Sequence, residues 1–223
     1  MANTSPLLQE AIGNQAITSA ARDSILDLLA RRRSPYAFSP HPVEPENLRK
    51  LFEAARWSPS SYNEQPWSFV VATRDEPEGY ERMLSVLVEA NQQWAQQAPV
   101  LALAVARLNF AQDGRPNRHA LYDLGQAVAH LTVQGTALGL VVHQMGGFNI
   151  EQARHSFHLP AGYEPVAVVA IGYPGDPEAL PEVLRRREEA PRSRRPLQEF
   201  VFSGNWGKPS PLTLQGSPER RNS

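Results

Sequence analysis

The sequence predicts a single domain of α+β or three-layer α/β class, because helical segments and buried strands alternate along it. Several segments carry apolar residues at helical spacing, and three apolar runs between them are typical of strands. The length of 223 residues and the apolar fraction of 41% fit one soluble globular domain. The sequence contains neither an internal repeat nor a long low-complexity segment, so nothing in it indicates a second domain.

Two helices are expected in the first quarter of the chain. Residues 1–18 are polar and aperiodic, so we expect a flexible arm there. The domain proper is expected to span residues 19–198, and its first helix to end in the cluster Arg31-Arg32-Arg33-Ser34. Pro45 is placed to open the second helix, because its ring suits the first helical position. The buried stripe of this second helix comprises Leu48, Leu51, Phe52 and Ala55.

The middle of the chain predicts two strands and two further helices. The run SFVVAT (68–73) follows the polar stretch PSSYNEQPW (59–67) and predicts a strand. Residues 79–97 predict one helix. The run VLALAVAR (100–107) is almost entirely apolar, which indicates a strand covered on both faces. Residues 119–140 predict a long helix whose small residues suit the close approach of another helix.

The last third of the chain predicts a third strand and an irregular arm. The segment HQMGGFN (143–149) is expected to form a glycine loop, with Asn149 as the N-cap of a short helix. The run PVAVVAIGY (165–173) predicts the third strand. Residues 174–198 are rich in proline, arginine and glutamate, and residues 199–223 are expected to form an arm and a polar tail.

Composition argues against several classes of function. The formal net charge of -1 provides no field for nucleic acid or anionic membranes. The chain has no cysteine, which excludes disulfides, thiolate catalysis and cysteine metal sites. No long apolar span and no signal-peptide pattern occurs, so we expect a cytoplasmic protein. Dinucleotide-fold and P-loop fingerprints are missing, and the pair His155 and His158 has no further ligand in pattern, so no metal site is expected.

Three polar clusters are candidates for function, although each has an ordinary structural explanation. Arg31-Arg32-Arg33-Ser34 could be cations at a helix C-terminus, Arg192-Ser193-Arg194-Arg195 a solvated loop, and PSSYNEQPW a polar turn. Together they suggest more. Two Arg/Ser clusters could converge on one phosphate, and the polar turn could meet a polyol or a heterocycle. Gly146 and Gly147 could present bare backbone N–H groups to a flat ring.

Four motifs resemble, in order, those of the nitroreductase-like FMN-dependent oxidoreductases. They are Arg32-Arg33-Ser34-Pro35-Tyr36-Ala37-Phe38, Ser58-Pro59-Ser60-Ser61-Tyr62-Asn63-Glu64-Gln65-Pro66-Trp67, Leu138-Gly139-Leu140 followed by Gly146-Gly147-Phe148, and Arg192-Ser193-Arg194. The resemblance implies a three-layer sandwich with a mainly antiparallel central sheet flanked by helices. It also implies a homodimer with a domain-swapped C-terminal arm, FMN at the subunit interface, and NAD(P)H as electron donor.

The resemblance assigns a role in FMN binding to individual residues of this chain. Arg32, Ser34, Arg192 and Arg194 would hold the phosphate and ribityl chain, with Arg33 close by. Pro59, Ser61 and Asn63 would come from the partner subunit, and Gln65 would brace their turn. Asn91 would face the flavin pyrimidine, and Met145, Gly146 and Gly147 would approach the ring edge near N5.

One position departs from the family pattern. Tyr36 stands where relatives usually carry Arg or Lys beside the flavin N1 and O2 edge, so we expect a lower reduction potential here. The polar loop at 109–119 lies where the family builds its substrate cap, and it is short. Its candidate lining residues are Phe110, Asn117, Arg118 and His119.

The favoured function is NAD(P)H-dependent reduction of nitro compounds, quinones or related small acceptors by a ping-pong mechanism. The cofactor would supply the chemistry, so no catalytic side chain is assigned. Two alternatives stay open. One is different flavin chemistry on the same fold, as in an oxidase, a reductive dehalogenase or a flavin-fragmenting enzyme. The other is a protein that stores or senses FMN.

Overall fold

A computed structural model describes residues 25–213 of the chain. The expected arm at 1–18 and the polar tail from residue 214 lie outside these residues. The described chain forms two compact units, one ending at Glu189 and one beginning at Ala190. The predicted division at residue 198 stays a prediction.

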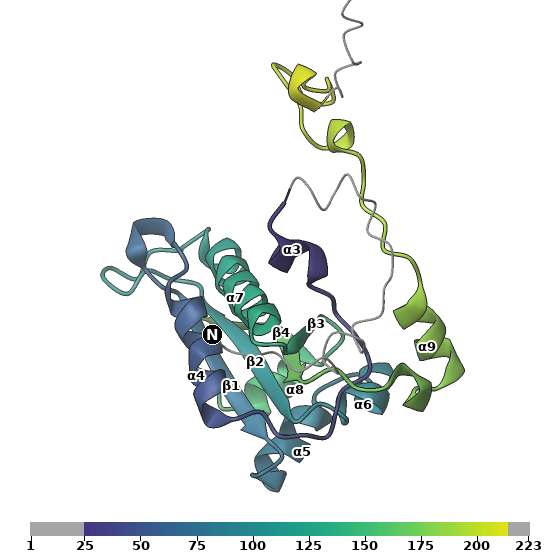
Figure 1. Cartoon of the computed structure of the whole chain (residues 1–223). Helices are drawn as coiled ribbons and strands as arrows, with labels where there is room; N and C mark the ends of the chain where they lie inside the picture. The colour runs from purple at the N-terminus through teal and green to yellow at the C-terminus, as the bar shows by residue number, and fades with distance from the viewer. Residues whose placement is uncertain (1–24, 214–223) are drawn as a thin grey trace, which may run out of the picture. The chain divides into compact units, whose positions relative to one another are not determined.

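A four-stranded sheet forms the centre of the first unit (Figure 1). Its strands are β1 (Trp67–Thr73), β2 (Val100–Arg107), β3 (Val141–Met145) and β4 (Tyr163–Gly172). The strand order is β1-β2-β4-β3, and every neighbouring pair is antiparallel. The predicted mainly antiparallel sheet is therefore confirmed.

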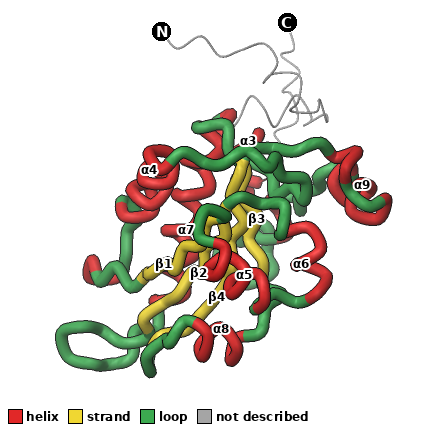
Figure 2. The backbone as a smooth tube through the Cα atoms, turned by 90° about the horizontal axis from the view of Figure 1, so that it is seen from below, coloured by secondary structure: helices red, strands yellow, loops and turns green. Residues whose placement is uncertain are grey.

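Two hydrophobic cores lie on opposite faces of the sheet, because side chains alternate along β2. Leu101, Leu103 and Val105 belong to one core. That core also receives α5 (Pro77–Ser85), α6 (Glu89–Ala95) and α8 (Ile150–Ser156). The alanines between these β2 residues belong to the other core, which α4 (Pro45–Arg56) and α7 (Ala120–Ala137) cover. Figure 2 shows the strands between these helices, which confirms the three-layer arrangement.

Small residues allow α7 to lie close to the sheet. The inner face of β2 presents alanines to this helix, and Gly135 of α7 meets β3. A methyl group at Gly135 would lie 3.0 Å from Val142 Cγ2, which is tighter than ordinary packing. The close contact packs β3 against the last turn of α7, and only residues 138–140 separate the two elements.

The single helix predicted at 79–97 is wrong, because the segment forms two helices, α5 and α6. Between them, Leu87 makes an antiparallel bridge with Phe148. The Val88 N–H donates to the Gly147 carbonyl at 3.1 Å, and the Asn149 N–H donates to the Val86 carbonyl at 2.7 Å. Residues 86–88 therefore hydrogen-bond to residues 147–149 in place of a helical partner. This pairing places the start of α6 beside Gly147.

The prediction of a loop beginning at residue 143 is also wrong. Residues 141–145 form β3, an edge strand in which His143 is opposite Ala170 of β4. The preceding helix ends at Ala137, and Gly139 has a φ of 75°, a left-handed conformation that suits the end of a helix. Only Gly146 to Phe148 remain as the glycine loop, followed by α8 with Asn149 as its confirmed N-cap.

Short elements complete the described chain. Asp27–Arg31 form α3, and Glu182–Glu189 form α9 at the end of the first unit. Four 3-10 helices are also present: η1 (Ser61–Asn63), η2 (Pro177–Ala179), η3 (Leu197–Glu199) and η4 (Pro211–Thr213). Between residues 25 and 213, no helix is both long and apolar enough to cross a bilayer.

Candidate functional site

The polar turn (residues 59–66) has a strained backbone. Tyr62, Asn63 and Gln65 have φ values of 55°, 55° and 50°, in the left-handed region. Asparagine tolerates this region, whereas each of the other two costs about 1–2 kcal/mol. The strain is offset by local hydrogen bonds. The Gln65 N–H donates to Ser60 Oγ at 2.9 Å, and Gln65 Nε2 donates to the Asn63 carbonyl at 3.3 Å. Gln65 therefore makes two hydrogen bonds within the turn, and its part in FMN binding stays a prediction.

Asp123 anchors the polar turn to α7. Its Oδ2 accepts the Ser61 N–H at 3.0 Å, and the residue is only 2% exposed. Sequence reasoning missed this residue. The available signal was a single carboxylate on an otherwise apolar stretch of the long helix.

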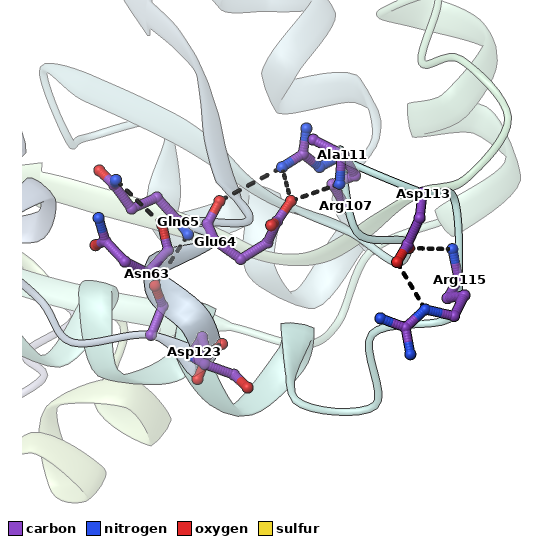
Figure 3. A network of polar contacts seen from close by, with 10 residues as sticks. Asn63, Glu64, Gln65, Arg107, Ala111, Asp113, Arg115 and Asp123 are labelled. Atoms are coloured by element: carbon purple, nitrogen blue, oxygen red, sulfur yellow. Dashed lines mark hydrogen bonds and ion pairs between the residues drawn. The ribbon is translucent and has the colours of Figure 1, made fainter.

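Glu64 joins the opposite side of the turn to other elements (Figure 3). Its Oε1 accepts the Ala111 N–H at 2.7 Å and also pairs with Arg107 Nη2. In Figure 3 the side chains of Asn63 and Gln65 point away from this ion pair. The turn thus has one side held by an ion pair and one side with two amide groups.

The glycine loop presents open backbone at one residue and packed backbone at the next. A methyl group at Gly146 would have no atom within 4 Å, whereas one at Gly147 would lie 2.7 Å from Asn91 Nδ2. Asn91 Nδ2 donates to the Gly147 carbonyl at 2.9 Å. Met145, the residue before this loop, is buried in the core. The structure therefore brings two of the predicted residues, Asn91 and Gly147, into contact, and their role in FMN binding stays a prediction.

The segment after α3 carries the first arginine cluster. Arg32 Nη1 donates to Ser34 Oγ at 3.2 Å, so these two polar groups lie side by side. Arg33 Nη2 instead contacts the Glu188 carbonyl of α9. The Glu188 carboxylate accepts the N–H groups of Tyr36 and Ala37 at 2.8 and 3.0 Å. Glu188 holds this segment in place, a role that the sequence did not reveal.

Tyr36 lies in an aromatic cluster. Its ring centroid is 5.2 Å from that of Trp94 and 5.0 Å from that of His143, and the Trp94 and His143 centroids are 4.4 Å apart. His143 Nδ1 lies 2.8 Å from the Pro35 carbonyl, which can only accept, so Nδ1 carries the proton. Burial lowers the pKa of His143, which favours the neutral ring. The imidazole therefore does not replace the positive charge that Tyr36 lacks.

The second arginine cluster belongs to the C-terminal unit. Arg194 Nη1 donates to the Ser193 carbonyl at 2.7 Å, and Arg195 pairs with Glu199 at 3.2 Å. Convergence of Arg192 and Arg194 with the first cluster stays a prediction. In the part of the chain that is described, no three His, Cys, Asp or Glu residues group as metal ligands would.

The residues of the first unit fit the chemical parts of FMN. Arg32 and Ser34 offer adjacent donors suited to phosphate. The amides of Asn63 and Gln65 suit a polyol or the edge of a heterocycle. Open space beside Gly146 leaves its backbone accessible to a flat ring, because no side chain intervenes.

Comparison with known proteins gives a consistent family assignment. The model of the nitroreductase family matches residues 29–90 and 79–173. An uncharacterized 15.4 kDa protein of Mycolicibacterium smegmatis is 36% identical over 126 residues, which cover 56% of this chain and 84% of the relative. A Streptomyces coelicolor protein, provisionally named NADH dehydrogenase/NAD(P)H nitroreductase, is 27% identical over 73% of this chain and 89% of its own length.

Two solved structures share the fold. An oxidoreductase containing FMN aligns with a TM-score of 0.79 at 35% identity, covering 82% of this chain and 93% of that one. A nitroreductase family protein from Clostridium difficile 630 aligns with a TM-score of 0.64 at 26% identity, covering 82% and 99%. Both alignments extend over most of the residues that the structure describes.

Proposed function

This chain belongs to the nitroreductase family, and from that premise we propose that it is an FMN-dependent oxidoreductase that uses NAD(P)H to reduce nitro compounds, quinones or related small acceptors. The observation that carries the proposal is the position of the polar turn and the glycine loop. Both lie within the matched residues, and both present groups that suit a flavin.

The chain's own residues would bind and orient the cofactor. FMN, when bound, would supply the redox chemistry between the nicotinamide donor and the acceptor, so one site would serve both half-reactions. Arg32 and Ser34 would hold the phosphate, with Arg192 and Arg194 completing the anion site. Asn63 and Gln65 would donate from the polar turn, and Gly146 would allow close approach of the ring edge.

We also propose a cytoplasmic homodimer in which the polar turn of one subunit completes the flavin site of the other. The exposed side of α7 supports this. Leu121 and Tyr122 are 50% and 69% exposed, and the exposed residues Gly125 and Ala129 follow on the same helix. A helix surface with small side chains allows the close packing of a second helix. Exchange of the C-terminal arms between subunits is part of the same proposal.

The 109–119 loop would border the acceptor. Its ends are joined by a bridge between Asn109 and Pro116, and the Phe110 N–H donates to the Arg115 carbonyl at 2.9 Å. The Phe110 ring makes an edge contact with Tyr62 of the polar turn, with centroids 5.9 Å apart. An aromatic wall of this kind suits planar acceptors such as nitroaromatics and quinones.

Two-substrate kinetics test the proposed mechanism. The FMN-loaded protein is assayed with NADH and with NADPH against a nitroaromatic compound and a quinone. Parallel double-reciprocal lines are expected, because the oxidised donor leaves before the acceptor binds. Intersecting lines would contradict the ping-pong order. Absence of turnover with every pair would favour storage or sensing of FMN.

A further inference from the structure

Glu64 connects two segments that the proposed function assigns to different tasks. The polar turn would contact the flavin, and the 109–119 loop would border the acceptor. A single oxygen, Glu64 Oε1, accepts the Ala111 N–H of that loop at 2.7 Å and pairs with Arg107 Nη2 at the end of β2.

The ion pair is well placed to hold a fixed geometry. The side chains of Glu64 and Arg107 are only 12% and 28% exposed, so solvent screens their attraction less than at a fully exposed pair. Arg107 Nε is buried and has no hydrogen-bond partner in the described chain, so the guanidinium depends on its Nη2 contacts with Glu64. The Arg107 N–H also donates to the Pro66 carbonyl at 2.7 Å, which ties the end of β2 to the turn.

An aromatic contact lies beside this polar one. Tyr62 of the turn and Phe110 of the loop meet at 5.9 Å between centroids, and the Arg115 guanidinium lies 5.9 Å from the centre of the Phe110 ring. Tyr62 is nevertheless 91% exposed. Because an exposed aromatic contact constrains a loop only weakly, the Glu64 carboxylate is the stronger of the two links.

The two sides of the turn point in different directions. In Figure 3 Glu64 reaches toward Arg107 and Ala111, whereas Asn63 and Gln65 extend from the other side. A ligand that fixes the amide side would therefore fix the position of Glu64 in the same backbone segment. Through Ala111, the loop would be fixed as well.

We infer that Glu64 is a positioning residue that couples the acceptor-bordering loop to the flavin-contacting turn. Binding of FMN at the turn orders the 109–119 loop through the Glu64 carboxylate. The loop is thus held more firmly for an acceptor when the cofactor is bound. This inference rests on the proposed FMN binding. It adds a coupling between the polar turn and the 109–119 loop, which the proposed function does not include.

Hydrogen–deuterium exchange of the full chain, with and without FMN, tests the coupling directly. In the unmodified protein, FMN is expected to slow exchange in both the polar turn and the 109–119 loop, by about tenfold in the loop, within the usual range of coupling between sites. In Glu64→Ala, FMN is expected to protect the turn but to leave exchange in the loop unchanged.

A matched control lies in the same loop. Asp113 pairs with Arg115 at 2.7 Å, and within residues 25–213 none of its hydrogen bonds reaches the turn, so Asp113→Asn removes an ion pair while leaving the Glu64 link. FMN-dependent protection of the loop is expected to persist in this variant. Loss of protection in Asp113→Asn as well would overturn the specific role of Glu64.

Glu64→Gln serves as the second variant if the alanine variant does not fold. Its amide oxygen can still accept the Ala111 N–H but carries no charge, so the contact with Arg107 weakens and loop protection is expected to lie between that of the unmodified protein and that of Glu64→Ala. Full protection in a folded Gln or Ala variant overturns the inference. If the unmodified protein binds FMN but exchange in the 109–119 loop is not slowed, the inference about Glu64 fails while the proposed function stands. If it binds no FMN, the proposed function fails with it.

Discussion

Tyr36 determines the electrostatics of one edge of the proposed flavin site. Its ring packs against Trp94 and His143, and the lowered pKa of His143 keeps that imidazole neutral. The cluster therefore supplies packing and hydrogen bonding but no positive charge. A reduced flavin carries negative charge, so its stability depends on nearby cations.

Tyr36→Arg is expected to raise the reduction potential of bound FMN. An added unit charge near the flavin contributes about 1–4 kcal/mol, which corresponds to roughly 20–90 mV for a two-electron couple. Potentials measured against reference dyes give the shift. Tyr36→Phe is the control, because it keeps the ring and adds no charge. A potential in the Arg variant no higher than in the unmodified protein would contradict this account.

His143 makes stability depend on pH. Burial lowers its pKa below the ordinary value of 6.5, so the unfolded chain binds a proton more readily than the folded one. The unfolding free energy is therefore expected to fall as pH decreases from about 7 through the lower folded-state pKa. Denaturant titrations across this range, compared with those of His143→Gln, isolate the contribution. An identical pH dependence in both proteins would count against the buried neutral imidazole.

At the scale of elements, the glycine loop is supported by α6 on one side. Asn91 and Val88 both donate to the Gly147 carbonyl, so the loop and the start of α6 form one hydrogen-bonded unit. Gly146 projects away from this unit into open space. The two glycines therefore have different reasons to lack a side chain.

Alanine at the two glycines is expected to give opposite results. Gly147→Ala displaces the Asn91 amide and crowds Val88, so the free energy of unfolding should fall by about 1–2 kcal/mol. Gly146→Ala should leave stability within about 0.5 kcal/mol but weaken FMN binding, because its methyl group enters the proposed ring space. Thermal unfolding and FMN fluorescence titration measure both. Unchanged FMN affinity in Gly146→Ala would argue against a flavin at this edge.

Several elements followed from the sequence, and others could not. The strands β1, β2 and β4 and the helices α4 and α7 were predicted because their periodicity or apolar runs are long. The five residues of β3 include His143 and Gln144 and follow a helix directly, so they lacked a strand pattern. The segment between α5 and α6 contains neither Gly nor Pro, so the sequence carries no signal that a helix ends there. The two helices are separated instead by the long-range bridge between Leu87 and Phe148.

The same contrast holds for the site. Motif residues such as Asn63 and Gly146 were identifiable by resemblance, and their role in binding FMN stays a prediction. Asp123 and Glu188 were not identifiable. Each accepts backbone N–H groups from a segment more than 60 residues away, and such contacts leave no local pattern. Long-range side-chain to backbone bonds are visible only once the chain is folded.

The proposed flavin site needs two copies of the chain, because the polar turn of one subunit would complete the site of the other. Ala129→Arg places a long cation on the exposed side of α7, where helix packing between subunits is proposed. We expect a monomer by light scattering, and FMN affinity lower by at least about tenfold, or 1.4 kcal/mol, because the partner's polar turn is lost. Val183→Arg on α9, at a residue 65% exposed, is the control and should remain dimeric. A monomeric unmodified protein that binds FMN fully would contradict the shared site.

NAD(P)H-dependent reduction is tested by an anaerobic absorbance spectrum of the FMN-loaded protein before and after addition of NADH and then NADPH. We expect the flavin absorbance to bleach within seconds with at least one donor, because donor and flavin would meet in one open site. Bound flavin whose spectrum neither nucleotide changes would contradict NAD(P)H-dependent reduction. Failure to retain any FMN after loading would contradict the cofactor itself.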